Sequence, residues 1–210
     1  VITGRASDPS LAVAPLAYEF GWSFEDYDKI AAATVLGHII ECGPQCTGGN
    51  YTDWRDVQDF AHIGFPVVEA YEDGSFIVTK HDGTGGLINV ESVTSQLLYE
   101  LGDPARYLSP DCVADFTTIQ MEQDGPNRVR VHGVKGLPAT DSFKVSMSYA
   151  NGYKILATLC IGGPDAIEKA HIVSDMVFSR MKMLGADIPT EDRFLELFGS
   201  NVLYKGIVES

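Results

Sequence analysis

Residues 66–89, PVVEAYEDGSFIVTKHDGTGGLIN, predict a β-hairpin, a glycine-rich loop and the start of a helix in that order. Two short runs rich in β-branched and aromatic residues flank Asp73-Gly74, and an Asp-Gly pair is typical of a hairpin turn. Three glycines follow within 83–86. Asn89 can then cap a helix, which we expect to extend to Leu101. The stretch therefore predicts antiparallel strands directly followed by a helix.

Upstream of the hairpin the sequence predicts two helices and a loop. Asp8 can cap a first helix that ends at Gly21. Ser23 and Asp26 have the spacing of a variant capping box, which predicts a second helix through Ile40. Residues 41–56, with several glycines and a proline and no consistent period, predict a long loop.

From about residue 113 the pattern becomes one of hairpins. Residues 113–122 and 128–134 are separated by Asp-Gly-Pro-Asn, and residues 143–150 and 153–161 are separated by Asn151-Gly152, so we expect two antiparallel hairpins. Helical spacing of apolar residues predicts a long helix over 165–184.

A short final helix is expected to begin at Thr190. The fold class is therefore α/β, or α+β overall. We expect strand–helix alternation in the first half and antiparallel β-hairpins packed by a long helix in the second. We expect the chain to divide into two parts, an α/β segment over residues 1–110 and the hairpins with the C-terminal helices over residues 111–210.

Charge and hydropathy exclude some classes of partner. Fifteen basic against 29 acidic residues give a net charge of −14 over 210 residues. Nucleic acids are bound largely through Lys and Arg, so no nucleic acid is expected as a partner. No apolar run is long enough to span a membrane, and no signal peptide is recognisable. We expect a cytoplasmic or organellar-matrix protein.

The glycine-rich loops at strand–helix junctions are candidate anion sites. Glycine backbone can approach a ligand closely, and the free N–H groups at a helix start attract anions. We expect ligand binding at two such junctions, through the residues Gly4, Arg5, Ser7, Lys80, Gly83, Thr84, Gly85 and Gly86. Neither junction matches a dinucleotide or P-loop motif, so a purely steric role for these glycines is the alternative.

His81 and Asp82 are the candidate catalytic residues. A histidine at the end of a strand can act as acid or base near neutral pH. Neighbouring side chains on a strand point to opposite faces, so the two need not cooperate. His38, in an apolar helix, is interpreted as a core residue. Cys42 and Cys46 lack the spacing of a zinc site, and no metal is predicted.

Four stretches together resemble the acyclic terpene utilisation protein AtuA family. They are ITGRASDPSLAVAPLAYEFGW at 2–22, HIIECGPQCTGGNYTDW at 38–54, GFPVVEAYEDGSFIVTKHDGTGGL at 64–87 and LCIGGPDAIEKA at 159–170. The resemblance covers nearly the whole chain. Members of the family are longer and carry an N-terminal α/β segment, so we expect this chain, which starts abruptly at Val1, to be a fragment.

The resemblance implies breakdown of branched isoprenoid acids as coenzyme A thioesters. It adds Gly48, Gly49 and Asn50 to the expected ligand-binding cleft. We expect an enzyme, or part of one, that performs hydration, lyase or isomerase chemistry on a branched acyl-CoA or related carboxylated metabolite, without a cofactor. The alternative is a non-catalytic assembly or ligand-binding module of a degradation complex.

A nucleotide or sugar phosphate remains open as the anion, because glycine loops do not specify one. The expected partners are an anionic small molecule and either further copies of the chain or the missing N-terminal segment.

Overall fold

The computed structural model describes residues 2, 4 and 6–199 and divides the chain into two units, Val1–Ser146 and Met147–Ser210. The fold is mixed α and β, as the sequence predicts. The expected boundary at residues 110 and 111 stays a prediction.

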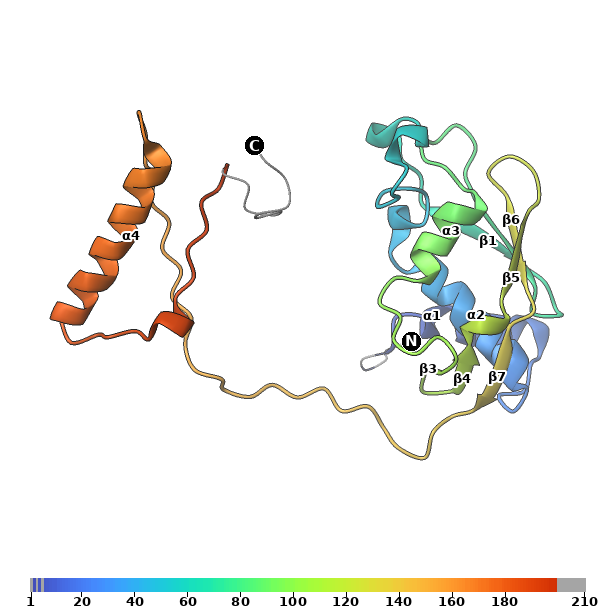
Figure 1. The fold of residues 1–210 in the computed structure, drawn as a ribbon. Helices are drawn as coiled ribbons and strands as arrows, with labels where there is room; N and C mark the ends of the chain where they lie inside the picture. Colours follow the sequence, from blue (N-terminus) through green and yellow to red (C-terminus); the bar gives the residue numbers. More distant parts are fainter. Residues whose placement is uncertain (1, 3, 5, 200–210) are drawn as a thin grey trace. The chain divides into compact units, whose positions relative to one another are not determined.

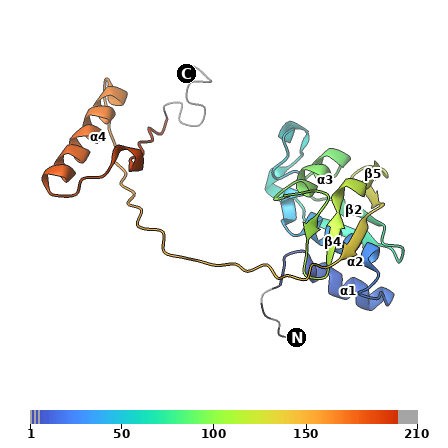
Figure 2. The same ribbon diagram turned by 60° about the horizontal axis from the view of Figure 1, so that its bottom comes forward.

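The first unit is built around one buried helix. Helix α2 (Tyr27–Ile40) has the run IAAATVLGHI, whose side chains are apolar on every face except at Thr34 and His38. A helix that is apolar all round is stable only when it is covered all round. Residues 30–39 are accordingly all buried. The covering elements are α1 (Ser10–Phe20), α3 (Val90–Leu97), β1 (Pro66–Ala70), β4 (Cys112–Asp115) and β7 (Lys135–Pro138) (Figures 1 and 2).

The strands of this unit form two antiparallel sheets. One has the order β1-β2-β6-β5, with β2 (Phe76–Lys80), β5 (Gln120–Gln123) and β6 (Val129–His132). The other has the order β3-β4-β7, with β3 (Tyr107–Leu108). In β6 the side chains of Val129 and Val131 are fully buried while those of Arg130 and His132 are not, the alternation of a half-buried strand.

The decisive hairpin forms as predicted. Strands β1 and β2 pair antiparallel, from Pro66 opposite Lys80 to Ala70 opposite Phe76. Gly74 closes the turn with φ of 86°, a conformation that glycine adopts at little cost. Asn89 caps α3 with a complete capping box, since its side chain accepts from Ser92 N–H and the Ser92 hydroxyl accepts from Asn89 N–H. The helix ends at Leu97, however, and not at Leu101.

The expected capping box at Ser23 is wrong. The Ser23 hydroxyl accepts from the N–H of Glu25 at 3.1 Å, so it closes a local turn. Helix α2 begins only at Tyr27, and the Asp26 side chain makes no capping bond. Side chains of Ser and Asp commonly bond to backbone two residues away, which competes with helix capping.

The expected single strand over 113–122 is also wrong. The Asp115 side chain accepts from the N–H of Thr117 and caps a 3-10 turn, Phe116–Thr118. This turn ends β4 and sends β5 into the other sheet. The predicted pairing across Asp124–Asn127 is confirmed, because β5 and β6 are antiparallel neighbours.

The second unit contains α4 (Ala166–Met183), which confirms the long helix. The second expected hairpin is wrong, since residues 143–161 include no strand and residues 143–160 are exposed. Gly152 has the turn-compatible φ of 84°, but an isolated two-stranded hairpin is at best marginally stable in water. The expected final helix is reduced to a 3-10 turn, Thr190–Asp192.

Close packing of α1 against α2 gives a first testable prediction. A Cβ atom at Gly37 would overlap the carbonyl oxygen of Pro9 and lie 2.7 Å from its Cα, both of them backbone atoms. Gly37→Ala is therefore expected to lower the free energy of unfolding by about 1–3 kcal/mol, the usual cost of overpacking. Urea unfolding measures it. Gly102→Ala is the control, because a Cβ there meets nothing within 4 Å. Equal effects of the two substitutions would contradict the prediction.

Candidate functional site

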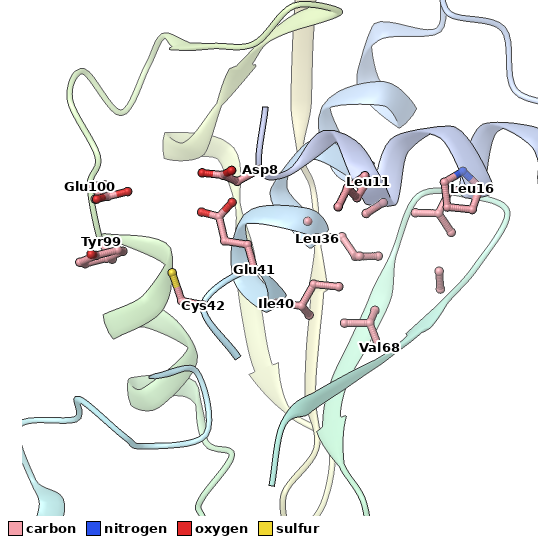
Figure 3. Close-up of a pocket in the computed structure, with 14 residues that line it drawn as sticks. Asp8, Leu11, Leu16, Leu36, Ile40, Glu41, Cys42, Val68, Tyr99 and Glu100 are labelled. Atoms are coloured by element: carbon pink, nitrogen blue, oxygen red, sulfur yellow. The ribbon is translucent and has the colours of Figure 1, made fainter. Parts of the chain in front are cut away.

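A groove of about 740 Å³ lies in the first unit, between α1, the C-terminal end of α2, strand β1 and the turn after α3 (Figure 3). Its walls are mostly apolar and are formed by Leu11, Ala12, Pro15, Leu16, Leu36, Gly37, Ile40, Val68 and Ala70. The four residues from α1 follow the i, i+1, i+4, i+5 spacing of one helix face. The volume is within the range of small-molecule sites.

One end of the groove is polar and acidic. Its residues are Asp8, Glu41, Cys42, Tyr99 and Glu100. Figure 3 shows the carboxyl group of Glu41 directed toward that of Asp8. Asp8 is exposed, while the Glu41 side chain is 12% exposed. The groove thus combines an apolar channel with carboxyl groups at one end.

Glu41 is the most perturbed carboxyl group of this site. Burial, together with the charges of Asp8 and Glu100, raises the pKa of Glu41 from its ordinary 4.5 to about 7. A carboxyl group with a pKa near neutrality can both donate and accept a proton under physiological conditions. Its Oε2 atom is buried and has no hydrogen-bond partner among the described residues.

His38 lies one helical turn before Glu41 and is buried behind it. Its Nδ1 is 3.1 Å from Glu41 Oε1, and its Nε2 is 3.2 Å from the carbonyl oxygen of Leu97. Burial lowers the pKa of His38 below 6.5, against the Leu97 hydrogen bond and the charge of Glu100, which raise it. The interpretation of His38 as a hydrogen-bonded core residue agrees with this placement, but its second partner is a groove residue.

The loop over 81–86 uses its backbone donors internally. The N–H of Gly85 donates to His62 O at 2.8 Å and that of Gly86 to Gln58 O at 2.7 Å. Both glycines are buried. A Cβ at either would lie within 3 Å of backbone atoms of the facing loop. In this arrangement the two N–H groups join the 81–86 loop to the preceding long loop.

The remaining residues of that loop lie at the surface. His81, Asp82 and Gly83 are exposed. The Lys80 ammonium donates to the carbonyl oxygen of Thr84 at 2.6 Å, and the Thr84 hydroxyl donates to His81 O at 2.6 Å. The roles assigned to these residues stay predictions.

The loop at Gly48, Gly49 and Asn50 does lie beside the 81–86 loop. Leu87 N–H donates to Thr47 O at 2.9 Å, which joins the two segments. The N–H of Gly49 donates to Pro44 O at 2.8 Å. The structure therefore brings these two predicted loops together, through bonds between their own backbones.

The N-terminal candidates Gly4, Arg5 and Ser7 precede helix α1 in the sequence. Ser7 accepts from Ser10 through its carbonyl oxygen, at the start of α1, and Gly4 is exposed. Arg5 lies outside the described residues. Asp8, the next residue after Ser7, lines the groove.

Sequence reasoning missed Asp8, Glu41 and Glu100 as site residues. A signal for Glu41 was present, because His38 and Glu41 form an i, i+3 polar pair at the end of an otherwise apolar helix. Of the two cysteines nearby, Cys42 lines the groove, whereas Cys46 is in the core, where burial raises the pKa of its thiol to about 12.

Neither a metal cluster nor a membrane span is found within the described part of the chain. Residues 2, 4 and 6–199 hold no group of three or more His, Cys, Asp or Glu side chains arranged to bind a metal ion. Over the same residues, no helix has the length and apolar character that crossing a bilayer requires.

Comparison with known proteins gives one result. A family model described as acyclic terpene utilisation family protein AtuA matches residues 1–203. No curated protein and no solved structure matches the chain. The match covers nearly all of the 210 residues and confirms the resemblance seen in the sequence. The chain therefore belongs to the acyclic terpene utilisation family AtuA, and its role is in the utilisation of acyclic terpenes.

Proposed function

We propose that the chain is a catabolic enzyme, or part of one, that holds the branched chain of an acyclic acyl thioester in the groove and transfers a proton through Glu41. The reaction class is hydration, lyase or isomerase chemistry. The observation that carries this proposal is a carboxyl group with a pKa of about 7 at the end of an apolar groove.

The apolar walls favour a hydrocarbon chain as the bound part. Acyclic terpenes are branched hydrocarbon chains, and burial of apolar surface contributes about 25 cal/mol per Å² to their binding. Leu11, Leu16, Ile40 and Val68 supply branched side chains to the wall. These side chains supply the apolar contact surface for a hydrocarbon chain.

The acidic end favours a thioester over a free acid. Burial and, after it, charge repulsion from Asp8 and Glu100 raise the pKa of Glu41, and the same charges would repel a ligand carboxylate. A thioester carbonyl is neutral and can accept a hydrogen bond. We expect the anionic part of a coenzyme A ligand to lie outside the acidic end of the groove. Whether the Lys80 and Thr84 region contacts it stays a prediction.

A matched pair of substitutions on α1 tests the groove as the binding site. Ala12 lines the groove and Ala14 is exposed outside it. An acyclic monoterpene acyl-CoA at about 100 times its dissociation constant should add roughly 2.7 kcal/mol to the free energy of unfolding of the wild type. Ala12→Phe is expected to fill the groove and remove this stabilisation. Ala14→Phe should keep it.

Thermal unfolding with the thioester, the free acid and coenzyme A measures these effects. Stabilisation by coenzyme A alone, or stabilisation retained in Ala12→Phe, would contradict binding of the ligand's hydrocarbon chain in the groove. Equal stabilisation by the free acid would contradict the argument from charge.

A non-catalytic assembly module is the second candidate function. Large apolar side chains in 143–159 are exposed, among them Phe143 at 96% and Tyr153 at 104%. A segment with this many exposed apolar side chains is a candidate for coverage by a partner. Sedimentation of the chain tests this alternative, since a monomer that still binds the acyl-CoA would argue against it.

A further inference from the structure

The hydrogen bonds of His38 define which of its ring nitrogens carries the proton. The Leu97 carbonyl oxygen can only accept, so Nε2, at 3.2 Å, must donate. In a neutral imidazole Nδ1 is then an acceptor. Nδ1 lies 3.1 Å from Glu41 Oε1, and a hydrogen bond between two acceptors needs a proton. That proton must lie on Oε1 or on Nδ1.

We propose that His38 and Glu41 share this one proton along the Nδ1–Oε1 hydrogen bond, so that Glu41 can take a proton from the groove at Oε2 while it passes its own to His38. The inference rests on the proposed function for the step that involves the ligand. The shared proton itself is a property of the free protein.

The step balances without a co-reactant. In the resting pair Oε1 carries the proton. Oε2 is buried without a described partner, and it accepts a proton when a ligand at this end of the groove reaches it. As the ligand's C–H or O–H bond breaks, an O–H bond forms at Oε2. The Oε1–H bond breaks and an N–H bond forms at Nδ1. Glu41 is neutral before and after, His38 becomes an imidazolium, and the ligand keeps the electron pair; the reverse step returns the proton.

Burial disfavours a positive charge on His38, and the negative charge of Glu100 partly offsets that cost. The charge of Glu100 acts on His38, and the charges of Asp8 and Glu100 act on Glu41. The other titratable groups around the pair are Cys42 and Tyr99 at the groove and Tyr107 beside the imidazole, with ring centroids 5.4 Å apart. Glu100 therefore offsets part of the burial cost of an imidazolium, and Asp8 and Glu100 both favour a neutral Glu41. His38 thus holds the extra proton only transiently.

The end of α3 fixes the orientation of His38. The Gln96 side chain donates to His38 O at 3.0 Å, and Leu97 accepts from the ring. Gln96 is fully buried, and His38 is only 1% exposed. The end of α3 thus holds both the main chain and the ring of His38. A flip of the imidazole ring would break its hydrogen bond to Leu97, so the ring is held with Nδ1 facing Glu41. His38 therefore positions the Glu41 carboxyl group as well as storing a proton.

Nuclear magnetic resonance of ¹⁵N-histidine-labelled chain, without ligand, tests the shared proton. His38 signals are assigned by replacing each of the other histidines by Gln in turn, so that a poorly folded His38 variant is not needed. Below pH 7, and above the pKa of His38 that burial lowers, we expect a proton on Nε2 and a hydrogen-bonded, unprotonated Nδ1. The Nδ1 signal should then shift in a step near pH 7, when Glu41 loses its proton.

Glu41→Gln is the matched control. The Gln amide can still donate to Nδ1 but cannot release a proton, so the Nε2–H form should persist and the step near pH 7 should disappear. A proton on Nδ1 of neutral His38 below pH 7, or an unchanged step in Glu41→Gln, would overturn the shared proton. Because no ligand is present, this result is separate from the thermal-shift test: failed acyl-CoA binding would overturn the proposed function and leave the proton sharing intact.

Discussion

Glu41→Gln should slow proton exchange between a bound acyclic acyl thioester and solvent by about 10²- to 10⁴-fold, the usual contribution of a general acid–base group. The amide has the shape of the carboxyl group and can donate to His38, so the groove and its ligand affinity should be preserved. Only the transferable proton is removed. Deuterium incorporation into the ligand in D₂O, followed by mass spectrometry, measures the rate, and calorimetry measures the affinity.

Glu19→Gln is the matched control for this substitution. Glu19 is an exposed carboxyl group on α1 and does not line the groove, so exchange should remain at the wild-type rate. His81→Ala is the informative comparison. If exchange survives in Glu41→Gln and is lost in His81→Ala, the proton-transfer group is the sequence-predicted His81, and the role proposed for Glu41 is wrong.

The titration of Glu41 should also make the folding stability of the protein depend strongly on pH. The folded pKa of Glu41 is raised from 4.5 to about 7, so between these values the folded state keeps a proton that the unfolded state has lost. Stability from this group is therefore present below pH 4.5 and falls as the pH rises to about 7. At 1.36 kcal/mol for each pKa unit, the loss is about 2–3 kcal/mol for a side chain that is 12% exposed.

Comparison with Glu41→Gln isolates this contribution. The neutral amide has no charge to bury, so the variant should gain about 2–3 kcal/mol of unfolding free energy relative to wild type between pH 4.5 and 7. His38 acts in the opposite sense, because its lowered pKa gives stability above pH 6.5 that is lost as the pH falls. Urea unfolding of both proteins from pH 4.5 to 8 measures the difference. A difference that does not change with pH would contradict the raised pKa of Glu41.

Elements specified by nearby residues could be predicted from the sequence. Asp73-Gly74 specifies the β1–β2 turn, Asn89 caps α3, and the apolar spacing of 166–183 gives α4. In each of these cases the interactions that decide the structure join residues within a few positions of one another. Family membership could also be recognised, because it too depends on the order of residues along the chain.

Local signals were insufficient where a distant partner decides. Asn151-Gly152 is a strong turn signal, yet no strand forms within 143–161, because a hairpin needs further strands or a core to cover it. The glycines at 85 and 86 suggested free backbone donors. Their partners are carbonyl groups at His62 and Gln58, and no spacing rule in the sequence links these residues to the loop.

The sequence by itself determined the secondary-structure elements with local turn and capping signals, the mixed α and β class, and the family. Only the tertiary structure decided the candidate site, because the groove is assembled from segments around residues 8–16, 36–42, 68–70 and 99–100. The raised pKa of Glu41 depends on its burial and on the charges of Asp8 and Glu100. Burial and Coulomb repulsion act through space, so the pKa of a carboxyl group follows from its neighbours in the fold and not from its neighbours in the chain.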